Sequence, residues 1–338
     1  MNTSRTVLVT GGAGYVGSHV VLELLATGYE PVVLDNLSTG RPENLPAGTP
    51  LVVGAVADAD LVGRLLTQHR IEAVLHFAGS IVVPESIEKP LLYYENNTAA
   101  SLSLIRTCVE HKVSRFVFSS TAAVYGTPTG EGPVDEERPT EPISPYGASK
   151  LMTEWMLRDT SRAHPSFQAV ALRYFNVAGA DPQGRTGQSG ASTTHLIRSA
   201  VEASLGRRPV LEVFGTDYPT RDGSCERDFI HVSDLAALHV KALAYLEAGG
   251  RSTIVNCGYG RGATVLEVIA ALEALTGAPL PVRHVGRRPG DAPSMVSDVS
   301  RMRSLFDWRP RHDDLMTIIG TALAWERGAS LRGGGGAR

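Results

Sequence analysis

The stretch TGGAGYVG, residues 10–17, decides the fold of this 338-residue chain. It joins the apolar run 6–10, which predicts a buried strand, to the segment 15–26, which predicts a helix. Glycines at this G-x-x-G-x-x-G spacing permit a turn with positive φ and a close approach of the backbone. The N-terminus of the following helix offers free N–H groups and a partial positive charge to a pyrophosphate.

An acidic residue ends the next expected strand, 31–34. Asp35 lies 18 residues after Gly17. A carboxylate at this place can accept hydrogen bonds from both hydroxyls of an adenosine ribose, which favours NAD over NADP. A tight structural turn with a surface Asp would leave similar residues, but the full order of strand, glycine loop, helix, strand and acid predicts a dinucleotide site.

Short β-rich runs alternate with helical patterns along the chain. The expected strands are 6–10, 31–34, 51–53, 73–77, 115–119, 169–173, 211–214, 253–257 and 281–285. The expected helices are 15–26, 58–69, 93–111, 146–163, 195–205, 232–246 and 265–275, with two more at the end. This alternation predicts an α/β fold, a Rossmann-type doubly wound parallel sheet with helices on both faces.

The rhythm of the chain changes at the Gly- and Ser-rich stretch 178–192, which we expect to be a long loop. We therefore expect a NAD-binding Rossmann domain at 1–175, to which about 228–258 returns. A smaller α/β C-terminal substrate lobe is expected at 176–330, and a flexible tail at 331–338.

Composition excludes several classes of protein. Lys and Arg number 32 against 35 Asp and Glu, so no excess of positive charge favours nucleic acid or an anionic membrane. No stretch reaches the roughly 18 apolar residues that a membrane-spanning helix needs, and the N-terminus lacks a secretory pattern. The scattered Cys108, Cys225 and Cys257 form neither a CxxC metal pair nor a disulfide framework. We expect a cytoplasmic protein without a metal site.

A tyrosine and a lysine stand four residues apart in the motif YGASK, at Tyr146 and Lys150. On a helix, residues i and i+4 share one face. Because an ammonium ion stabilises a phenolate, we expect Lys150 to lower the pKa of Tyr146 from about 10. Such a base could take a proton from a sugar or alcohol hydroxyl while hydride leaves for a nicotinamide. Chance places such pairs on many helices, but here a dinucleotide fingerprint precedes the pair.

Hydroxyl side chains end the expected strand 115–119. Ser119, Ser120 and Thr121 each have the chemistry to hydrogen-bond a reacting oxygen, since ligands of open α/β sheets bind beyond the carboxyl ends of the strands. Small residues follow the strand 73–77 in the motif HFAG, where the backbone could approach a cofactor.

Longer motifs make the chain resemble the nucleotide-sugar epimerases of the extended short-chain dehydrogenase/reductase family. They are LDNLSTG, HFAGSIVVPES, YYENN, FSSTAAVYG, SPYGASK, LRYFNVAGA, FGTDYPTRDGSCERDFIHVSDLA and RRPGD. The resemblance runs from Val7 to about Glu326. It implies reversible C4 epimerisation of UDP-galactose and UDP-glucose, by transient hydride transfer to tightly bound NAD through a 4-keto sugar. It also implies a homodimer that pairs helices 93–111 and 146–163.

The resemblance assigns roles to individual residues. Tyr146 would be the catalytic base, Lys150 its electrostatic partner and a ribose ligand, and Thr121 the catalytic hydroxyl. The implied cofactor contacts are Gly11, Gly14, Tyr15, Val16, Gly17, Asp35, Asn36, Phe77, Ala78, Gly79, Asn96, Tyr146, Lys150 and Phe175. The implied substrate contacts are Thr121, Tyr146, Asn176, His195, Leu196, Val213, Phe214, Arg227, Arg288, Asp291 and Met295.

Some of these positions carry a second interpretation. Arg227 and Arg288 suit a diphosphate by charge and bidentate geometry, although surface salt bridges would also use them. His195 either contacts the uracil or caps a helix, and we favour the cap. Met295, which is large but flexible, argues weakly for sugars without an acetamido group.

Two positions depart from the family pattern, and three other functions compete with the implied one. Ala55 replaces an acid that contacts the adenine, and Ile81 replaces a lysine. A dehydratase or decarboxylase of the superfamily would need an acid beside Thr121, where Ala122 stands. An epimerase for UDP-arabinose/xylose, UDP-GlcNAc or UDP-glucuronate stays open, and a silent NAD-binding sensor would have lost the Tyr–Lys pair.

Overall fold

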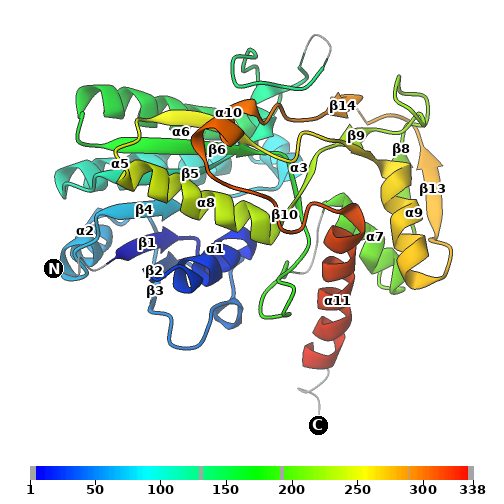
Figure 1. The fold of residues 1–338 in the computed structure, drawn as a ribbon, viewed down its shortest axis with the longest axis horizontal. Helices are drawn as coiled ribbons and strands as arrows, with labels where there is room; N and C mark the ends of the chain where they lie inside the picture. The colour runs from blue at the N-terminus through cyan, green and yellow to red at the C-terminus, as the bar shows by residue number, and fades with distance from the viewer. Residues whose placement is uncertain (1–4, 129–131, 191–193, 289, 334–338) are drawn as a thin grey trace.

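A seven-stranded sheet forms the centre of the molecule (Figure 1). The structure, a computed structural model, describes residues 5–128, 132–190, 194–288 and 290–333. The strands lie in the order β11-β6-β5-β4-β1-β2-β3 and all pair in parallel. They are β1 (Thr6–Thr10), β2 (Glu30–Asp35), β3 (Leu51–Val53), β4 (Ala73–His76), β5 (Arg115–Thr121), β6 (Gln168–Tyr174) and β11 (Thr253–Cys257). The order reverses between β1 and β4, which creates a topological switch point.

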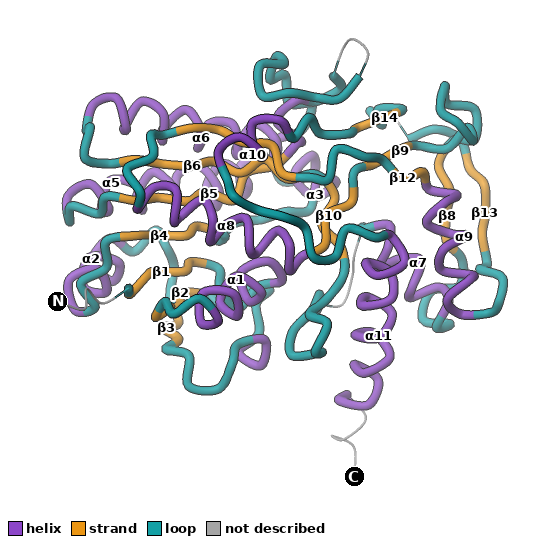
Figure 2. The backbone as a smooth tube through the Cα atoms, in the orientation of Figure 1, coloured by secondary structure: helices purple, strands orange, loops and turns teal. Residues whose placement is uncertain are grey.

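Helices cover both faces of this sheet (Figure 2). Successive side chains of a strand point to opposite faces; in β1, Val7 and Val9 join one core cluster and Leu8 the other. The first cluster includes α1 (Tyr15–Ala26) and α8 (Val232–Glu247). The second includes α2 (Ala59–Gln68), α5 (Ala100–Glu110) and α6 (Pro145–Ala163). The predicted doubly wound α/β fold is confirmed.

The helix expected over 93–111 has an irregular start. Short helices α3 (Val83–Glu88) and α4 (Pro90–Tyr93) lead into a π-helical turn, η2 (Tyr94–Ala99), and then into α5. Single π-turns inside α-helices are frequent at functional sites because they rotate the side chains of neighbouring residues.

A second group of elements lies beside the carboxyl ends of the main strands (Figure 1). Its helices are α7 (Leu196–Ser204), α9 (Val265–Thr276) and α11 (Leu315–Gly333), whereas α10 (Ser300–Leu305) packs against β11 of the main sheet. Its strands are β7 (Asn176–Ala178), β8 (Leu211–Phe214), β9 (Glu226–Arg227), β10 (Phe229–His231), β12 (Ala263–Thr264), β13 (Val282–Val285) and β14 (Ser294–Met295). Two 3₁₀ turns, η1 (Pro42–Asn44) and η3 (Ala122–Tyr125), follow β2 and β5. β8 pairs with β13, β7 with β10, and β9 with both β12 and β14.

The chain crosses between the two groups more than once. After β10, helix α8 packs on the main sheet and β11 adds the strand next to β6. The last helix, α11, continues to Gly333, and residues 334–338 of the expected tail lie outside the described part. Within the described ranges, none of the helices is long and apolar enough to cross a bilayer.

Candidate functional site

The glycine loop lies at the switch point, packed against the loop that follows β4. Gly11 has φ +69°, and a Cβ on it would lie 2.5 Å from the backbone nitrogen of Ala78. A Cβ on Gly17 would lie 2.3 Å from the carbonyl oxygen of Gly11. Gly14 is the N-cap of α1 and has no side chain to occupy the first turn. Backbone alone therefore lines this concavity, as a pyrophosphate site requires.

Asp35 is buried at the end of β2 and holds the glycine loop in place. One carboxylate oxygen accepts a hydrogen bond from the N–H of Ala13 at 3.0 Å, and the other from the N–H of Leu37 at 2.8 Å. The neighbouring Asn36 is exposed. The acid is thus anchored beside the first turn of α1, where an adenosine ribose would lie.

Tyr15 connects the glycine loop to the other group of elements. Its hydroxyl donates to the carbonyl oxygen of Gly179 at 2.6 Å, and Ser18 in the next turn of α1 contacts Thr186 at 2.8 Å. The described part of the loop expected over 178–192 therefore lies against α1, and its last two residues, 191 and 192, are outside the described part.

Helix α6 carries the Tyr–Lys pair. Pro145 is its first residue, and the hydroxyl of Ser144 accepts from the N–H of Gly147, so the predicted helix start is confirmed. Tyr146 and Lys150 are both buried. The Lys150 ammonium donates to the carbonyl oxygen of Ser119 at 2.9 Å and lies 4.9 Å from the centre of the Phe118 ring.

Of the three candidate hydroxyls, Thr121 contacts the tyrosine. Its hydroxyl and the Tyr146 phenol form a hydrogen bond. The hydroxyl of Ser119 lies 2.7 Å from the Tyr174 hydroxyl, and that of Ser120 donates to Glu154 at 2.5 Å. The alternatives left open by the sequence thus reduce to Thr121.

Burial is the largest cause of the pKa shifts of both Tyr146 and Lys150. It raises the pKa of Tyr146 above its usual range; Tyr174 and Tyr93 add to this, and the Thr121 hydrogen bond opposes it. The expected net lowering of this pKa is wrong for the chain alone, because the cost of desolvating the phenolate sets the direction of the shift. Burial lowers the pKa of Lys150 to about 8, and the carboxylate of Glu154 opposes that shift.

The loop after β4 reaches the catalytic helix. A Cβ on Gly79 would lie 3.7 Å from the Lys150 ammonium. Two neighbouring asparagines of the π-helical turn hold Ser80: Asn96 donates to its hydroxyl at 2.8 Å, and Asn97 accepts from its N–H at 2.7 Å. Asn97, which also donates to the Ser149 hydroxyl at 3.0 Å, was not among the predicted site residues. Its only sequence signal was its place in YYENN.

Several implied substrate contacts meet in the second group of elements. The guanidinium of Arg227 donates to the carbonyl oxygen of Ala292 at 2.8 Å and lies 3.5 Å from the Asp291 carboxylate. Arg288 lies 4.0 Å from the centre of the Phe214 ring. Met295 pairs with Arg227 in the β14–β9 register. Met295 and Phe175 pack against Ala122, Val124 and Tyr125 just beyond Thr121, so this group borders the catalytic end of β5.

The remaining predicted residues have clear positions. His195 is the N-cap residue of α7, but its side chain forms no capping hydrogen bond; Nδ1 lies 2.9 Å from the Gln188 amide. The favoured capping interpretation was wrong, since the loop before α7 engages the ring. Val213 is fully buried in the core, and Leu196 begins α7. Asn176 starts β7, where its N–H donates to the backbone carbonyl oxygen of Asp228 at 3.0 Å.

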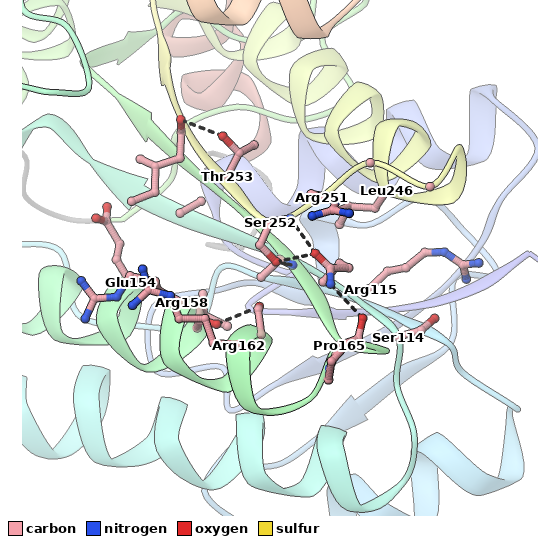
Figure 3. A pocket seen from close by; sticks show the side chains of 18 of the residues that line it. Ser114, Arg115, Glu154, Arg158, Arg162, Pro165, Leu246, Arg251, Ser252 and Thr253 are labelled. Carbon is pink, nitrogen blue, oxygen red and sulfur yellow. Dashed lines mark hydrogen bonds between the residues drawn. The ribbon is translucent and has the colours of Figure 1, made fainter.

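A separate cavity of about 960 Å³ opens at the opposite end of the sheet (Figure 3). It lies where β5, β6 and β11 begin, and Arg158, Arg162 and Glu154 of α6 line one wall. It therefore borders the buried end of Glu154 rather than the Tyr–Lys pair.

The arrangement at the carboxyl ends of the strands fits a bound dinucleotide, because the backbone cradle, the anchored acid and the Tyr–Lys pair converge on the switch point. These features define a Rossmann-fold protein of the short-chain dehydrogenase/reductase type. The model of the NAD dependent epimerase/dehydratase family matches residues 7–258. The chain belongs to that family and, within it, to the group of the UDP-glucose 4-epimerases.

Individual relatives are similar over nearly their whole length. A UDP-glucose 4-epimerase of Azospirillum brasilense is 56% identical, over 96% of this chain and 92% of the relative. The crystal structure of the Brucella ovis UDP-glucose 4-epimerase in complex with NAD is 42% identical with a TM-score of 0.91, covering 95% of this chain and 98% of that one. The Stenotrophomonas maltophila UDP-glucose-4-epimerase, with bound NAD and formylated UDP-arabinopyranose, is 36% identical with a TM-score of 0.94, covering 97% and 99%.

Proposed function

We propose that the protein is an NAD-dependent isomerase that interconverts UDP-galactose and UDP-glucose by inverting C4. One observation carries the proposal: the Tyr146 phenol is hydrogen-bonded to Thr121 at the carboxyl end of β5, next to the switch point, in a chain 56% identical to a UDP-glucose 4-epimerase. The dehydratase alternative lacks support, since Ala122 and Ala123 follow Thr121.

The cofactor site would be formed by the two loops at the switch point and the first turn of α6. Bound NAD supplies a hydride acceptor and a positive charge next to the tyrosine. The residues proposed to hold it are Gly11, Gly14, Tyr15, Val16, Gly17, Asp35, Asn36, Phe77, Ala78, Gly79, Asn96, Tyr146, Lys150 and Phe175. Exposed Ala55 and Ile81 contribute no polar contact there.

Tyr146 would act as the base. Its phenolate takes the proton of the sugar 4-hydroxyl, and Thr121 hydrogen-bonds the same oxygen. Lys150, held by the Ser119 carbonyl, stabilises the phenolate by its charge. The phenol would return the proton to the same oxygen once C4 is inverted, so the proton transfers cancel over one turnover. The bound NAD would supply the hydride exchange, which consumes no external reductant.

The nucleotide sugar would occupy the space between the catalytic end of β5 and the second group of elements. Arg227 and Arg288 are the proposed diphosphate ligands, because guanidinium groups pair with phosphate oxygens in a bidentate manner. The full proposed set is Thr121, Tyr146, Asn176, His195, Leu196, Val213, Phe214, Arg227, Arg288, Asp291 and Met295.

The proposed cofactor contacts and the proposed sugar contacts suggest two lobes. The NAD lobe would comprise residues 1–175 with about 228–258, and the UDP-sugar lobe the remainder of 176–330. We also propose a homodimer through α5 and α6. Leu102 and Trp155, which are 43% and 46% exposed, lie along a shallow groove between these helices. A cytoplasmic location agrees with three cysteines that are buried and unpaired.

The test is to incubate the purified protein separately with UDP-galactose, UDP-GalNAc and UDP-arabinose, without added reductant, and to separate the products. Conversion of UDP-galactose to UDP-glucose supports the proposal. Conversion of UDP-GalNAc or UDP-arabinose alone would identify that sugar, and not UDP-galactose, as the substrate. No turnover of any of the three would refute the assignment as an epimerase.

A further inference from the structure

One face of α6 presents a third residue in line with the catalytic pair. Tyr146, Lys150 and Glu154 follow at intervals of four and are all buried. Each of them contacts a different residue at the end of β5. The tyrosine bonds Thr121, the lysine donates to the Ser119 carbonyl, and Glu154 accepts from the Ser120 hydroxyl at 2.5 Å.

Glu154 is buried against an arginine of the neighbouring strand. Its side chain is 1% exposed and forms a fork-like ion pair with Arg173 of β6, at 2.9 Å from Nε and 2.6 Å from Nη2. The second arm of Arg173 donates to the Tyr125 hydroxyl at 2.9 Å. A buried ion pair adds little net stability compared with apolar residues of the same size, so packing alone does not account for a carboxylate here.

Among the described residues, Glu154 is the carboxylate that acts on Lys150. The other titratable groups near Lys150 and Tyr146 are phenols and one imidazole, together with the ion pair of Glu154 and Arg173. From each packed element these groups are Tyr146 and Glu154 of α6, Tyr93 of α4, His76 of β4, and Arg173 and Tyr174 of β6. Glu154 is therefore the one anion among these groups.

We propose that Glu154 is a positioning residue whose charge keeps Lys150 an ammonium ion, so that the lysine can stabilise the Tyr146 phenolate. The proposal rests on the function proposed above. The hydrogen bond to Ser120 and the fork of Arg173 hold the carboxylate one turn beyond the lysine. Arg173 offsets part of its negative charge, and burial keeps water from screening the remainder. Glu154 touches neither substrate nor cofactor and acts only through Lys150.

Three variants separate this role from a structural one. E154Q keeps the shape and removes the charge, whereas S120A removes a hydrogen bond of Glu154 and keeps the charge. The double variant E154Q/R173M removes both buried charges, and it restores folding if the unpaired arginine unfolds E154Q.

Titration of Lys150 in the purified holoprotein measures the effect directly. The chain has four lysines, Lys89, Lys112, Lys150 and Lys241, so selective ¹³Cε labelling gives a readable NMR spectrum. In E154Q we expect the Lys150 midpoint to fall by about one pH unit, with S120A unchanged. In the double variant we expect a smaller fall, because the positive charge of Arg173 is lost together with the carboxylate. The basic limb of the kcat profile with UDP-galactose should move with the midpoint. An unchanged midpoint in E154Q or the double variant, or an equal shift in S120A, would overturn the proposal.

The cavity in Figure 3 permits a rescue experiment, since Glu154 lines it and its removal leaves the Arg173 guanidinium without its carboxylate partner. In E154A, sodium formate should return the Lys150 midpoint toward wild type, and formamide should not. Equal effects of formate and formamide would contradict a role of charge. Because the NMR titration needs no turnover, an inactive wild type would refute the proposed function and leave this test decisive.

Discussion

The phenol of Tyr146 and the hydroxyl of Thr121 form a hydrogen bond that joins the first turn of α6 to the carboxyl end of β5. Burial raises the pKa of the phenol, so the chain alone keeps it protonated at neutral pH. The active base therefore requires positive charge from Lys150 and from the nicotinamide. We therefore expect Tyr146 to act as a base only when NAD is bound.

Replacing Tyr146 with Phe should lower kcat by about 10²–10⁴-fold, because the general base is removed while the ring still packs. The bound cofactor, measured by its release on denaturation, should remain. Y245F is a matched control, because that hydroxyl contacts only the backbone of Arg251, far from the site. Full activity in Y146F would refute the assigned base.

Gly17 should tolerate no Cβ. The added atom would lie 2.3 Å from the Gly11 carbonyl, and a backbone atom cannot move aside cheaply. We expect G17A to lose about 1–3 kcal/mol of unfolding free energy and to bind NAD at least about tenfold more weakly. G320A is the control, since nothing lies within 4 Å of its Cβ position in α11. The NAD affinity of the apoprotein is measured by calorimetric titration. An equal affinity in G17A and wild type would contradict this description of the loop.

Stability should fall as the pH drops below about 6.5. Four buried imidazoles have folded-state pKa values below that of an unfolded histidine: about 4 for His19 and His239, and about 3 for His76 and His231, in each case mainly through burial. The unfolded chain thus binds more protons between pH 6.5 and 4. The contribution of these histidines to the free energy of unfolding is complete above this pH range. As the pH falls through the range, each histidine loses about 1.4 kcal/mol per pH unit.

Urea unfolding at pH 7.5 and 5.5 measures this loss. H239F should reduce the difference by the share of one histidine. It also removes the hydrogen bond between Nδ1 and the carbonyl oxygen of Leu235, which lowers stability at both pH values. H164Q changes an exposed side chain and should leave the difference as it is. Equal stability of the wild type at both pH values would refute the prediction.

A charge on α5 should break the proposed dimer. Leu102 is 43% exposed and borders the groove between α5 and α6, so L102E would bury a carboxylate in the contact. Leu25 of α1 is also 43% exposed, and L25E provides the control. Light scattering should show a dimer for wild type and L25E and a monomer for L102E. A wild-type monomer, or an L102E dimer, would exclude this interface.

The main sheet could be predicted from the sequence because its strands are continuous apolar runs, such as Val7-Leu8-Val9, that end in glycines or polar residues. The two-residue strands β9, β12 and β14 could not be, since they are too short for any periodicity. The π-helical turn left no signal either, because it changes hydrogen bonds without changing polarity.

The site was predictable where motifs are local and less so where contacts are distant. Tyr146 and Lys150 stand on one helix, whereas the choice of Thr121 over Ser119 and Ser120 needed the positions of α6 and β6. The hydrogen bond from the Ser80 N–H to Asn97 and the ion pair of Glu154 with Arg173 each join separate elements. The pKa of Tyr146 was misjudged since sequence spacing shows charge but not burial.

The most direct test of the central claim follows the hydrogen at C4. UDP-galactose carrying deuterium at C4 is incubated with the protein in ordinary water, without added reductant, and the UDP-glucose formed is analysed by NMR. We expect the deuterium to remain at C4 of the product, because the hydride returns to the sugar that it left. Loss of the deuterium to water, or the absence of any UDP-glucose, would contradict epimerisation by transient hydride transfer.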